Sequence, residues 1–141
     1  MGVRILEARD IKGKDAGNTS DPYVRLKCAN LESQVSRMHS QTNNAVWNQS
    51  FTFNELKMNQ GELETFELIF QLCDYNDFAS NQIIGVYSMG LSTIYRHANH
   101  EFHKVWLRLV DPNDLNPTAC TGYLRVSAFI VGPGERPPIH T

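Results

Sequence analysis

The sequence predicts an all-β protein with the architecture of an eight-stranded antiparallel β-sandwich. Short runs of alternating apolar and polar residues recur along the chain, and turn-forming residues separate them. The clearest run spans residues 22–28, where Val24, Leu26 and Cys28 would face the core while Tyr23 would face solvent. The 141 residues, 41% of them apolar and 20% charged, suffice for one domain with a single core.

The expected strands follow one another along the whole domain. In chain order they cover residues 3–8, 22–28, 33–41, 50–54, 66–72, 83–89, 105–109 and 122–131. A break in the alternation at Ile5 and Leu6 predicts a β-bulge in the first strand. The Pro- and Gly-rich residues 132–141 cannot continue a sheet, so we expect a domain over residues 1–131 followed by a C-terminal linker.

Three connections between these strands are long enough to describe. Residues 43–48 are predicted to form a turn, and residues 55–64 are polar and without periodicity, which indicates an irregular segment. Residues 91–100 favour a short helix, with Ser92 or Thr93 as its N-cap.

Composition excludes several classes of protein. The formal net charge of −2 and the scattered basic residues argue against a nucleic-acid partner. The three cysteines are odd in number, far apart and in no metal-binding spacing, which is typical of free thiols in a reducing, cytoplasmic setting. No apolar run is long enough to span a bilayer, so membrane contact within this chain would be peripheral.

Two acidic loops stand out, each between strand-like runs. Residues 12–24 place Asp15 and Asp21 six positions apart across a turn that contains glycine and asparagine. Residues 73–85 form the second loop, and its first carboxylate is Asp74. Carboxylates held by such loops can converge on calcium, which takes six to eight oxygen ligands. In the alternative interpretation these aspartates only shape the turns.

The two loops, in this order, resemble those of the C2 domain, a calcium- and phospholipid-binding β-sandwich. The segments that carry the resemblance are Gly13-Lys-Asp15, Thr19-Ser-Asp-Pro-Tyr-Val24, Asn44-Ala-Val-Trp-Asn48 with Phe51, Asp74-Tyr-Asn-Asp-Phe78 and Ile83-Ile-Gly85. The stretch from Trp106 to Glu135 is also similar to the end of the second C2 domain of ferlins. Ferlins are large, tail-anchored proteins with many C2 domains that act in vesicle fusion and membrane repair.

The strand order selects one of the two connectivities of this family. The strand that feeds the Asp15 loop is the first in the chain, and an eighth strand follows the seventh. We therefore expect the type II topology, with the first and last strands side by side and both termini at the end opposite the acidic loops.

The resemblance also implies which residues would bind calcium. The family uses about five aspartates, two in the first loop and three in the later one. Asp15, Asp21 and Asp74 match this pattern, whereas Asn76 and Gln82 stand where aspartates are expected. The predicted metal site comprises Asp15, Asp21, Asp74, Asn76 and the additional carboxylate Asp77. Because two carboxylates are replaced by amides, calcium binding should be weak or lost.

A membrane-contact set follows from the same resemblance. Phe78 at the loop tip would enter the headgroup region of an anionic phospholipid membrane, helped by Lys12 and Lys14. Since one aromatic and two lysines anchor weakly, sister C2 domains of a longer chain would add avidity. A second lipid site on the third strand is disfavoured, because that strand offers only Arg37 and His39.

The predicted function is that of a peripheral phospholipid-binding C2 module. It would belong to a ferlin-like protein of membrane trafficking, vesicle fusion or exocytosis, lying in the cytoplasm against a membrane to which the parent protein is anchored. The alternative is a calcium-independent scaffold domain that binds other proteins or other parts of its own chain.

An enzyme is not expected, because the sequence has no nucleophile elbow and no phosphate-binding glycine loop. One other cluster has metal-ligand chemistry. His97, His100 and His103 at three-residue spacing could place two imidazoles on one face of a helical turn near Glu101. Solvent-exposed histidines in an insertion are the favoured alternative.

Overall fold

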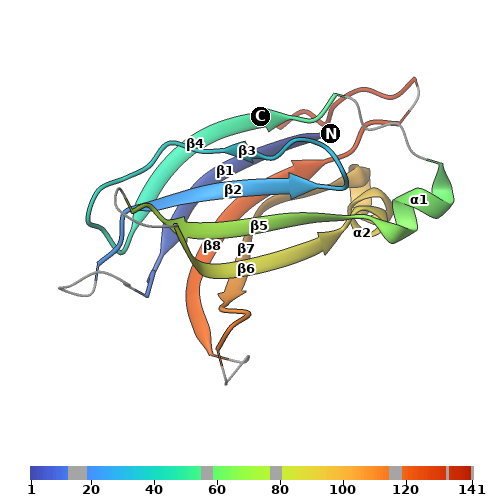
Figure 1. The fold of residues 1–141 in the computed structure, drawn as a ribbon. Helices are drawn as coiled ribbons and strands as arrows, with labels where there is room; N and C mark the ends of the chain where they lie inside the picture. Colours follow the sequence, from blue (N-terminus) through green and yellow to red (C-terminus); the bar gives the residue numbers. More distant parts are fainter. Residues whose placement is uncertain (13–18, 55–58, 77–80, 115–118, 133, 141) are drawn as a thin grey trace.

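The computed structural model describes residues 1–12, 19–54, 59–76, 81–114, 119–132 and 134–140, and its architecture is a β-sandwich (Figure 1). The strands are β1 (Gly2–Arg9), β2 (Pro22–Cys28), β3 (Gln34–Val35), β4 (Ala45–Thr52), β5 (Glu67–Asp74), β6 (Gln82–Gly90), β7 (Glu101–Val110) and β8 (Cys120–Phe129). Two short helices, α1 (Gln60–Thr65) and α2 (Leu91–Arg96), and a 3-10 turn over Ala98–His100 complete the described elements.

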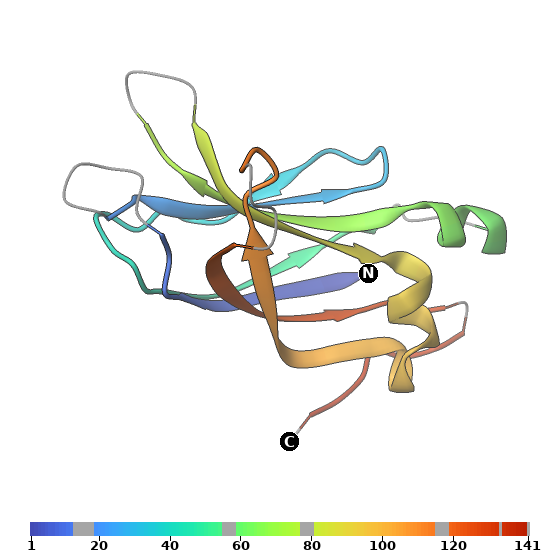
Figure 2. The ribbon, with the colours of Figure 1, turned by 90° about the horizontal axis from the view of Figure 1, so that it is seen from below.

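The eight strands form two layers. Their order is β3-β2-β5-β6-β7-β8-β1-β4, and neighbouring strands run antiparallel. β6 and β7 are joined by one residue pair, Val86 with Val110. Because the pairing is so short, the sheet can bend here and form two layers. Figure 2 shows the resulting layers, one containing β2 and β5 and the other β1 and β8. The predicted eight-stranded antiparallel sandwich is thus confirmed.

The first and last strands lie side by side, which confirms the type II topology. Gly2 is paired with Phe129 at one end of β1, and Arg9 is paired with Tyr123 at the other. The register shifts between Ile5 and Glu7, which is the bulge that the broken alternation predicts. The N-terminal ammonium group donates to the carbonyl of Phe53 (3.1 Å), at the end of the sandwich away from the loops that follow β1 and β5 (Figure 1).

The core lies between the two layers and contains the apolar residues of the alternating runs. Val24, Leu26 and Cys28 are fully buried, as predicted. Tyr23 is an exception, because the alternation predicts that it faces solvent whereas it is only 6% exposed. It is paired with Cys73 of β5, and its hydroxyl accepts a hydrogen bond from Asn81 Nδ2 (2.8 Å), so the segment after β5 covers it.

Two of the predicted element boundaries on the β3–β4 side are wrong. Residues 33–41 contain only the two-residue strand Gln34–Val35. The hydroxyl of Ser36 accepts from the backbone N–H of Val24 (2.8 Å), so a side chain takes the place of a ladder hydrogen bond and regular pairing ends there. The predicted turn over residues 43–48 is also too long, because β4 already begins at Ala45.

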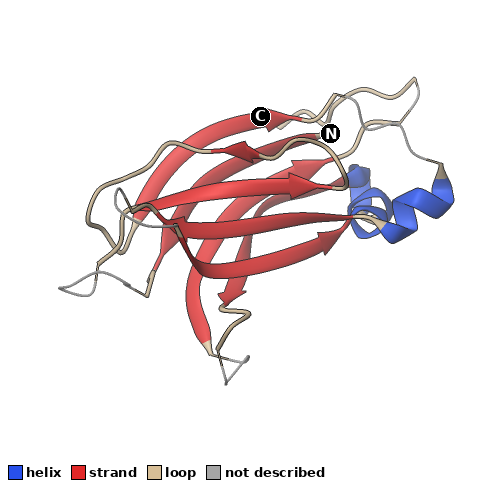
Figure 3. Ribbon diagram, in the orientation of Figure 1, coloured by secondary structure: helices blue, strands red, loops and turns tan. Residues whose placement is uncertain are grey.

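The helices also differ from the sequence-based expectation, in the presence of α1 and in the N-cap of α2. Part of the segment expected to be irregular forms α1, whose N-cap Asn59 accepts from the N–H of Glu62 (2.9 Å). In α2 the N-cap is Gly90, so neither Ser92 nor Thr93 takes that position. Both helices lie together at one end of the sandwich (Figure 3), where Arg96 pairs with Glu64 at 2.6 Å. Across the described segments, neither helix has the length or apolar character to traverse a bilayer.

Candidate metal centre

The two acidic segments meet at the end of the sandwich where β2 begins and β5 ends. Pro22 is paired with Asp74, which brings the preceding residue, Asp21, beside the second loop. The backbone N–H of Asp21 donates to Asp74 Oδ1 (2.9 Å), and the N–H of Tyr75 donates to the Asp21 carbonyl (3.0 Å). Asp74 is only 4% exposed, and the hydrogen bond from Asp21 holds its carboxylate against the residue that precedes β2.

The Asp21 side chain is fixed by the segment that precedes β4. Its Oδ1 accepts from the backbone N–H of Gln41 (2.7 Å). Next to this contact, Ser20 and Thr42 form an isolated β-bridge, with the Thr42 N–H donating to the Ser20 carbonyl (2.8 Å). Asp21 is therefore held between two neighbouring loops rather than only within its own.

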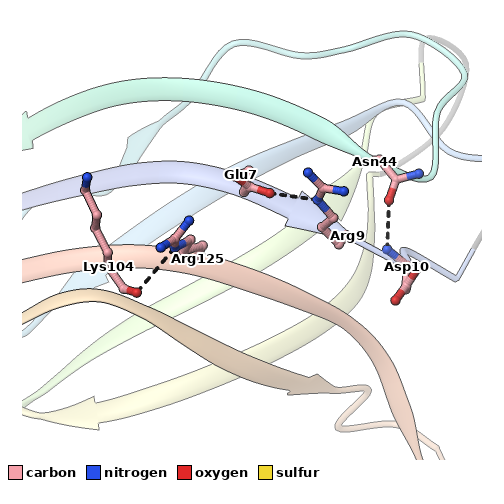
Figure 4. Close-up of polar contacts among 6 residues, drawn as sticks. All are labelled: Glu7, Arg9, Asp10, Asn44, Lys104 and Arg125. Atoms are coloured by element: carbon pink, nitrogen blue, oxygen red, sulfur yellow. Dashed lines mark hydrogen bonds and ion pairs between the residues drawn. The ribbon is translucent and has the colours of Figure 1, made fainter.

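Asn44 joins the middle segment to the end of β1. Its Oδ1 accepts from the backbone N–H of Asp10 (3.1 Å), as Figure 4 shows. The preceding residue, Asn43, bonds to Ile11 twice: its Nδ2 donates to the Ile11 carbonyl (2.8 Å), and its own carbonyl accepts from the Ile11 N–H (2.9 Å). These bonds fix the base of the first acidic loop and give Asn44 a structural role.

The two amides that replace expected carboxylates lie next to Asp74. Gln82, the first residue of β6, is directly opposite Asp74 in the antiparallel register. Opposed residues of such a pair have Cβ atoms about 4.5–5.5 Å apart on one face of the sheet. Asn76 follows Asp74 by two residues and is exposed, and its backbone N–H donates to Asn81 Oδ1 (2.9 Å).

The described residues include about half of the predicted site. Asp21, Asp74 and Asn76 lie at the same end of the sandwich, as expected. Lys12 is also described: it is exposed, and its backbone N–H donates to the carbonyl of Thr121 (2.9 Å). The remaining predicted residues, Asp15, Lys14, Asp77 and Phe78, lie outside the described residues, and their roles stay predictions.

Two residues that fix this site are not identifiable from the sequence. Gln41 supplies a backbone N–H to Asp21, a role to which its side chain gives no clue. Asn81 bridges two segments, because its Oδ1 accepts from Asn76 and its Nδ2 donates to the Tyr23 hydroxyl. An asparagine between a loop and a strand is a common turn residue, which conceals such a bridge in the sequence.

The arrangement has oxygen chemistry suited to a hard cation, but few charges. Asp21 and Asp74 bring two carboxylates together, and each uses one oxygen to accept a backbone N–H. Calcium takes six to eight oxygens, so these two groups need help from amide carbonyls, water or further carboxylates. Gln82 and Asn76 offer neutral oxygens at neighbouring positions, which weakens the attraction for a divalent ion.

Comparison with known proteins gives the family. The C2 domain family matches residues 1–109. Among solved structures, a C2 domain of plant extended synaptotagmin 1 superposes with a TM-score of 0.68 at 20% identity, covering 89% of this chain and 88% of that one. Human GIVD cytosolic phospholipase A2 superposes with a TM-score of 0.61 at 22% identity, over 89% of this chain but 16% of that chain. At these identities the likeness shows the fold alone.

Three relatives found by sequence similarity are ferlins. Ferlin 2 of Tetrahymena thermophila is 48% identical over 98% of this chain, and Ferlin 2 of Toxoplasma gondii is 30% identical over 98%. Myoferlin of Xenopus tropicalis is 28% identical over 97% of the chain. The matched segments are 8%, 9% and 7% of the length of these three relatives. The chain therefore belongs to the C2 domain family, and its similarity to ferlins over nearly its whole length confirms the ferlin resemblance.

Proposed function

We propose that this C2 domain is a peripheral phospholipid-binding module of a ferlin-like protein in membrane trafficking, and that it binds calcium weakly. The supporting observation is the meeting of Asp21 and Asp74 at one end of the sandwich, with amides at Asn76 and Gln82 beside them. Two fixed carboxylates retain some attraction for calcium, while the amides lower the charge that holds it.

The membrane would meet the domain at this loop end. An anionic leaflet repels an acidic loop cluster, and a bound divalent ion reverses that repulsion. Lys12 is exposed at the base of the first acidic loop and adds a favourable contact worth about 1 kcal/mol near an anionic surface. Phe78 and Lys14 complete the proposed membrane-contact set, and Asp15 and Asp77 complete the proposed calcium ligands. Such a surface anchors weakly alone, so sister C2 domains would supply the remaining affinity.

The domain acts by binding rather than by catalysis. Its likeness to a phospholipase structure covers 16% of that chain, the portion that shares the C2 fold. In the three ferlins compared above, the matching segment makes up less than a tenth of the protein. We place the parent protein at the cytoplasmic side of a membrane in vesicle fusion or exocytosis.

A protein-binding scaffold is the second candidate, and an exposed aromatic surface favours it. Trp106 of β7 is 46% exposed, and the guanidinium carbon of Arg125 lies 5.6 Å from the centroid of its ring. Tyr123 of β8, two residues from Arg125, is also exposed. Tryptophan, tyrosine and arginine are the residues most enriched at the centres of protein interfaces.

Co-sedimentation with vesicles separates the two candidates. The 141-residue chain is mixed with vesicles of phosphatidylserine and phosphatidylcholine, with a chelator or with up to millimolar calcium. The membrane module predicts attachment that increases with calcium and decreases for Lys12→Ala, while Trp106→Ala changes it little. At lipid concentrations high enough to detect weak attachment, absence of attachment under every condition would favour the scaffold.

A further inference from the structure

A second cluster of metal-ligating side chains lies at the opposite end of the domain. Glu101 is the first residue of β7, His103 follows two residues later, and His140 comes from the C-terminal segment. The candidate ligand atoms of these three residues all lie within 4.8 Å of one another. His140 Nε2 is already 2.8 Å from Glu101 Oε2, and Glu101 is only 7% exposed.

The C-terminal segment reaches this position because it turns back along the sheet end. After β8, the N–H of Ile130 donates to the carbonyl of His100 (3.0 Å). Farther on, Glu135 accepts from the hydroxyl of Tyr95 (2.9 Å) and pairs with His100 Nε2 (3.0 Å). The groove beside β7, about 660 Å³ in volume, is lined by the 3-10 turn and by residues 135, 136 and 138–140. The tail predicted as a linker therefore docks on the domain.

The ligand set matches the preferences of zinc. Zinc binds imidazole nitrogen and carboxylate oxygen, and two histidines with one glutamate is an established three-ligand combination with water in the fourth position. Calcium prefers six to eight oxygens, so two imidazoles select against it. With bonds of about 2.0–2.2 Å, the ligand atoms of a tetrahedral zinc site lie roughly 3.3 Å apart. Since no two of the ligand atoms are more than 4.8 Å apart, they must close by at most about 1.5 Å to reach that spacing.

Side-chain rotation can achieve this closure. The His103 and His140 rings stack face to face, with centroids 3.5 Å apart and planes inclined by 11°. The nitrogen lone pairs of the two imidazoles lie in the ring planes, and these planes are nearly parallel. One ring must therefore turn before both can coordinate the same ion. Both histidines are exposed, which leaves room for such a turn, while the buried Glu101 serves as the fixed ligand.

We propose that Glu101, His103 and His140 form a zinc site that fastens the C-terminal segment to β7. The positive charges of Lys104 and Arg125 lie near His103 and oppose a divalent ion, so we expect a dissociation constant of about 10⁻⁶–10⁻⁵ M rather than the tighter binding of closed structural zinc sites. This site is independent of the acidic loops. Bound zinc would hold residues 134–140 against β7.

Calorimetric titration of zinc into the 141-residue chain tests the proposal. We expect one equivalent to bind, with affinity at least tenfold lower in His103→Ala and in His140→Ala. His39→Gln and Cys120→Ser are the controls, because these groups could bind zinc non-specifically, and they should leave the affinity unchanged. Circular dichroism establishes that each variant is folded. Cobalt in place of zinc should give the strong visible absorption of tetrahedral coordination.

Hydrogen exchange supplies a second readout. Zinc should slow amide exchange in residues 134–140 of the wild type but not of His103→Ala. Asp21→Asn alters the proposed calcium site and should leave zinc binding unchanged. Loss of calcium binding can therefore be distinguished from loss of zinc binding. The proposal is overturned if zinc does not bind, or if either His103→Ala or His140→Ala binds it as tightly as the wild type.

Discussion

The backbone N–H of Asp21 donates to the Asp74 carboxylate, so the second acidic loop holds the backbone of the first. Replacement of Asp74 should therefore separate structure from ion binding. Asp74→Asn keeps an acceptor oxygen and should fold much like the wild type while losing calcium affinity. Asp74→Ala leaves the N–H of Asp21 without this partner and should lower the free energy of unfolding by about 1–3 kcal/mol. Urea denaturation measures the difference; equal stability of the two variants would contradict the structural role.

Phe51 is a second position where the prediction is quantitative. It is 8% exposed and lies on β4 within the core. Phe51→Ala should lower the free energy of unfolding by about 3–5 kcal/mol, a large part of a domain's stability. Val46→Ala, on the same strand but at a position 55% exposed, is the matched control and should change it by less than about 0.5 kcal/mol. An unchanged melting temperature for Phe51→Ala would contradict the observed register.

Trp47 should stabilise the β3–β4 side through its indole N–H. Trp47 is 2% exposed, its Nε1 donates to the Arg37 carbonyl (2.8 Å), and Arg37 Nη2 donates back to the Trp47 carbonyl (2.6 Å). Trp47→Phe keeps most of the apolar contact but removes one of the two hydrogen bonds that the Arg37 carbonyl accepts, the other coming from the Ser36 hydroxyl (2.9 Å). We therefore expect a loss of about 0.5–1.5 kcal/mol. Thermal unfolding measures this loss. An unchanged melting temperature would show that the reciprocal pair contributes no net stability.

The cysteines should differ in reactivity. Burial raises the pKa of the Cys28 thiol to about 11, and burial also raises the pKa of Cys73. Both thiols are therefore protonated at about pH 8, and because the thiolate is the reactive form they should resist alkylation until the protein unfolds. Cys120 is partly exposed and should react first. Mass spectrometry of the alkylated native protein locates the modified residues; rapid modification of Cys28 would contradict its burial.

The fold is predictable where the pattern is strictly periodic. The alternation in β2 and β5 and the broken alternation at Ile5 and Leu6 correctly predict strands and a bulge. Prediction fails where a side chain replaces a backbone partner, as Ser36 does beside Val24, and in α1, which is too short to show a helical period.

The candidate site also contains some residues that a local sequence pattern predicts and others that it does not. Asp21 and Asp74 are identifiable because carboxylates flank strands that are neighbours in the sandwich. The contributions of Gln41 and Asn81 depend on three-dimensional proximity between segments that are distant in sequence, which no local pattern encodes. The burial of Tyr23 escapes prediction for the same reason, since Asn81 covers its hydroxyl.

Restoring the replaced carboxylates should strengthen calcium binding. Because Gln82 lies directly opposite Asp74, Gln82→Asp places a new carboxylate beside the existing one, and Asn76→Asp adds another nearby. Unit charges about 4 Å apart interact by roughly 4 kcal/mol at an effective dielectric of about 20, and dehydration and mutual repulsion offset much of it. We expect about one to two orders of magnitude in affinity per restored aspartate. The double variant should also attach to anionic vesicles at micromolar calcium, and Asp21→Asn in that background should abolish the attachment.

Calorimetric titration of calcium into the wild-type domain, beside the Asn76→Asp and Gln82→Asp double variant, tests the central claim most directly. The account predicts a wild-type dissociation constant of about 10⁻⁴–10⁻³ M or weaker, and micromolar binding by the double variant. Low-micromolar binding by the wild type would contradict the claim that the amides at Asn76 and Gln82 weaken the site. A double variant that still does not bind calcium would show that these loops do not form the calcium site, and the scaffold function would then be the better account.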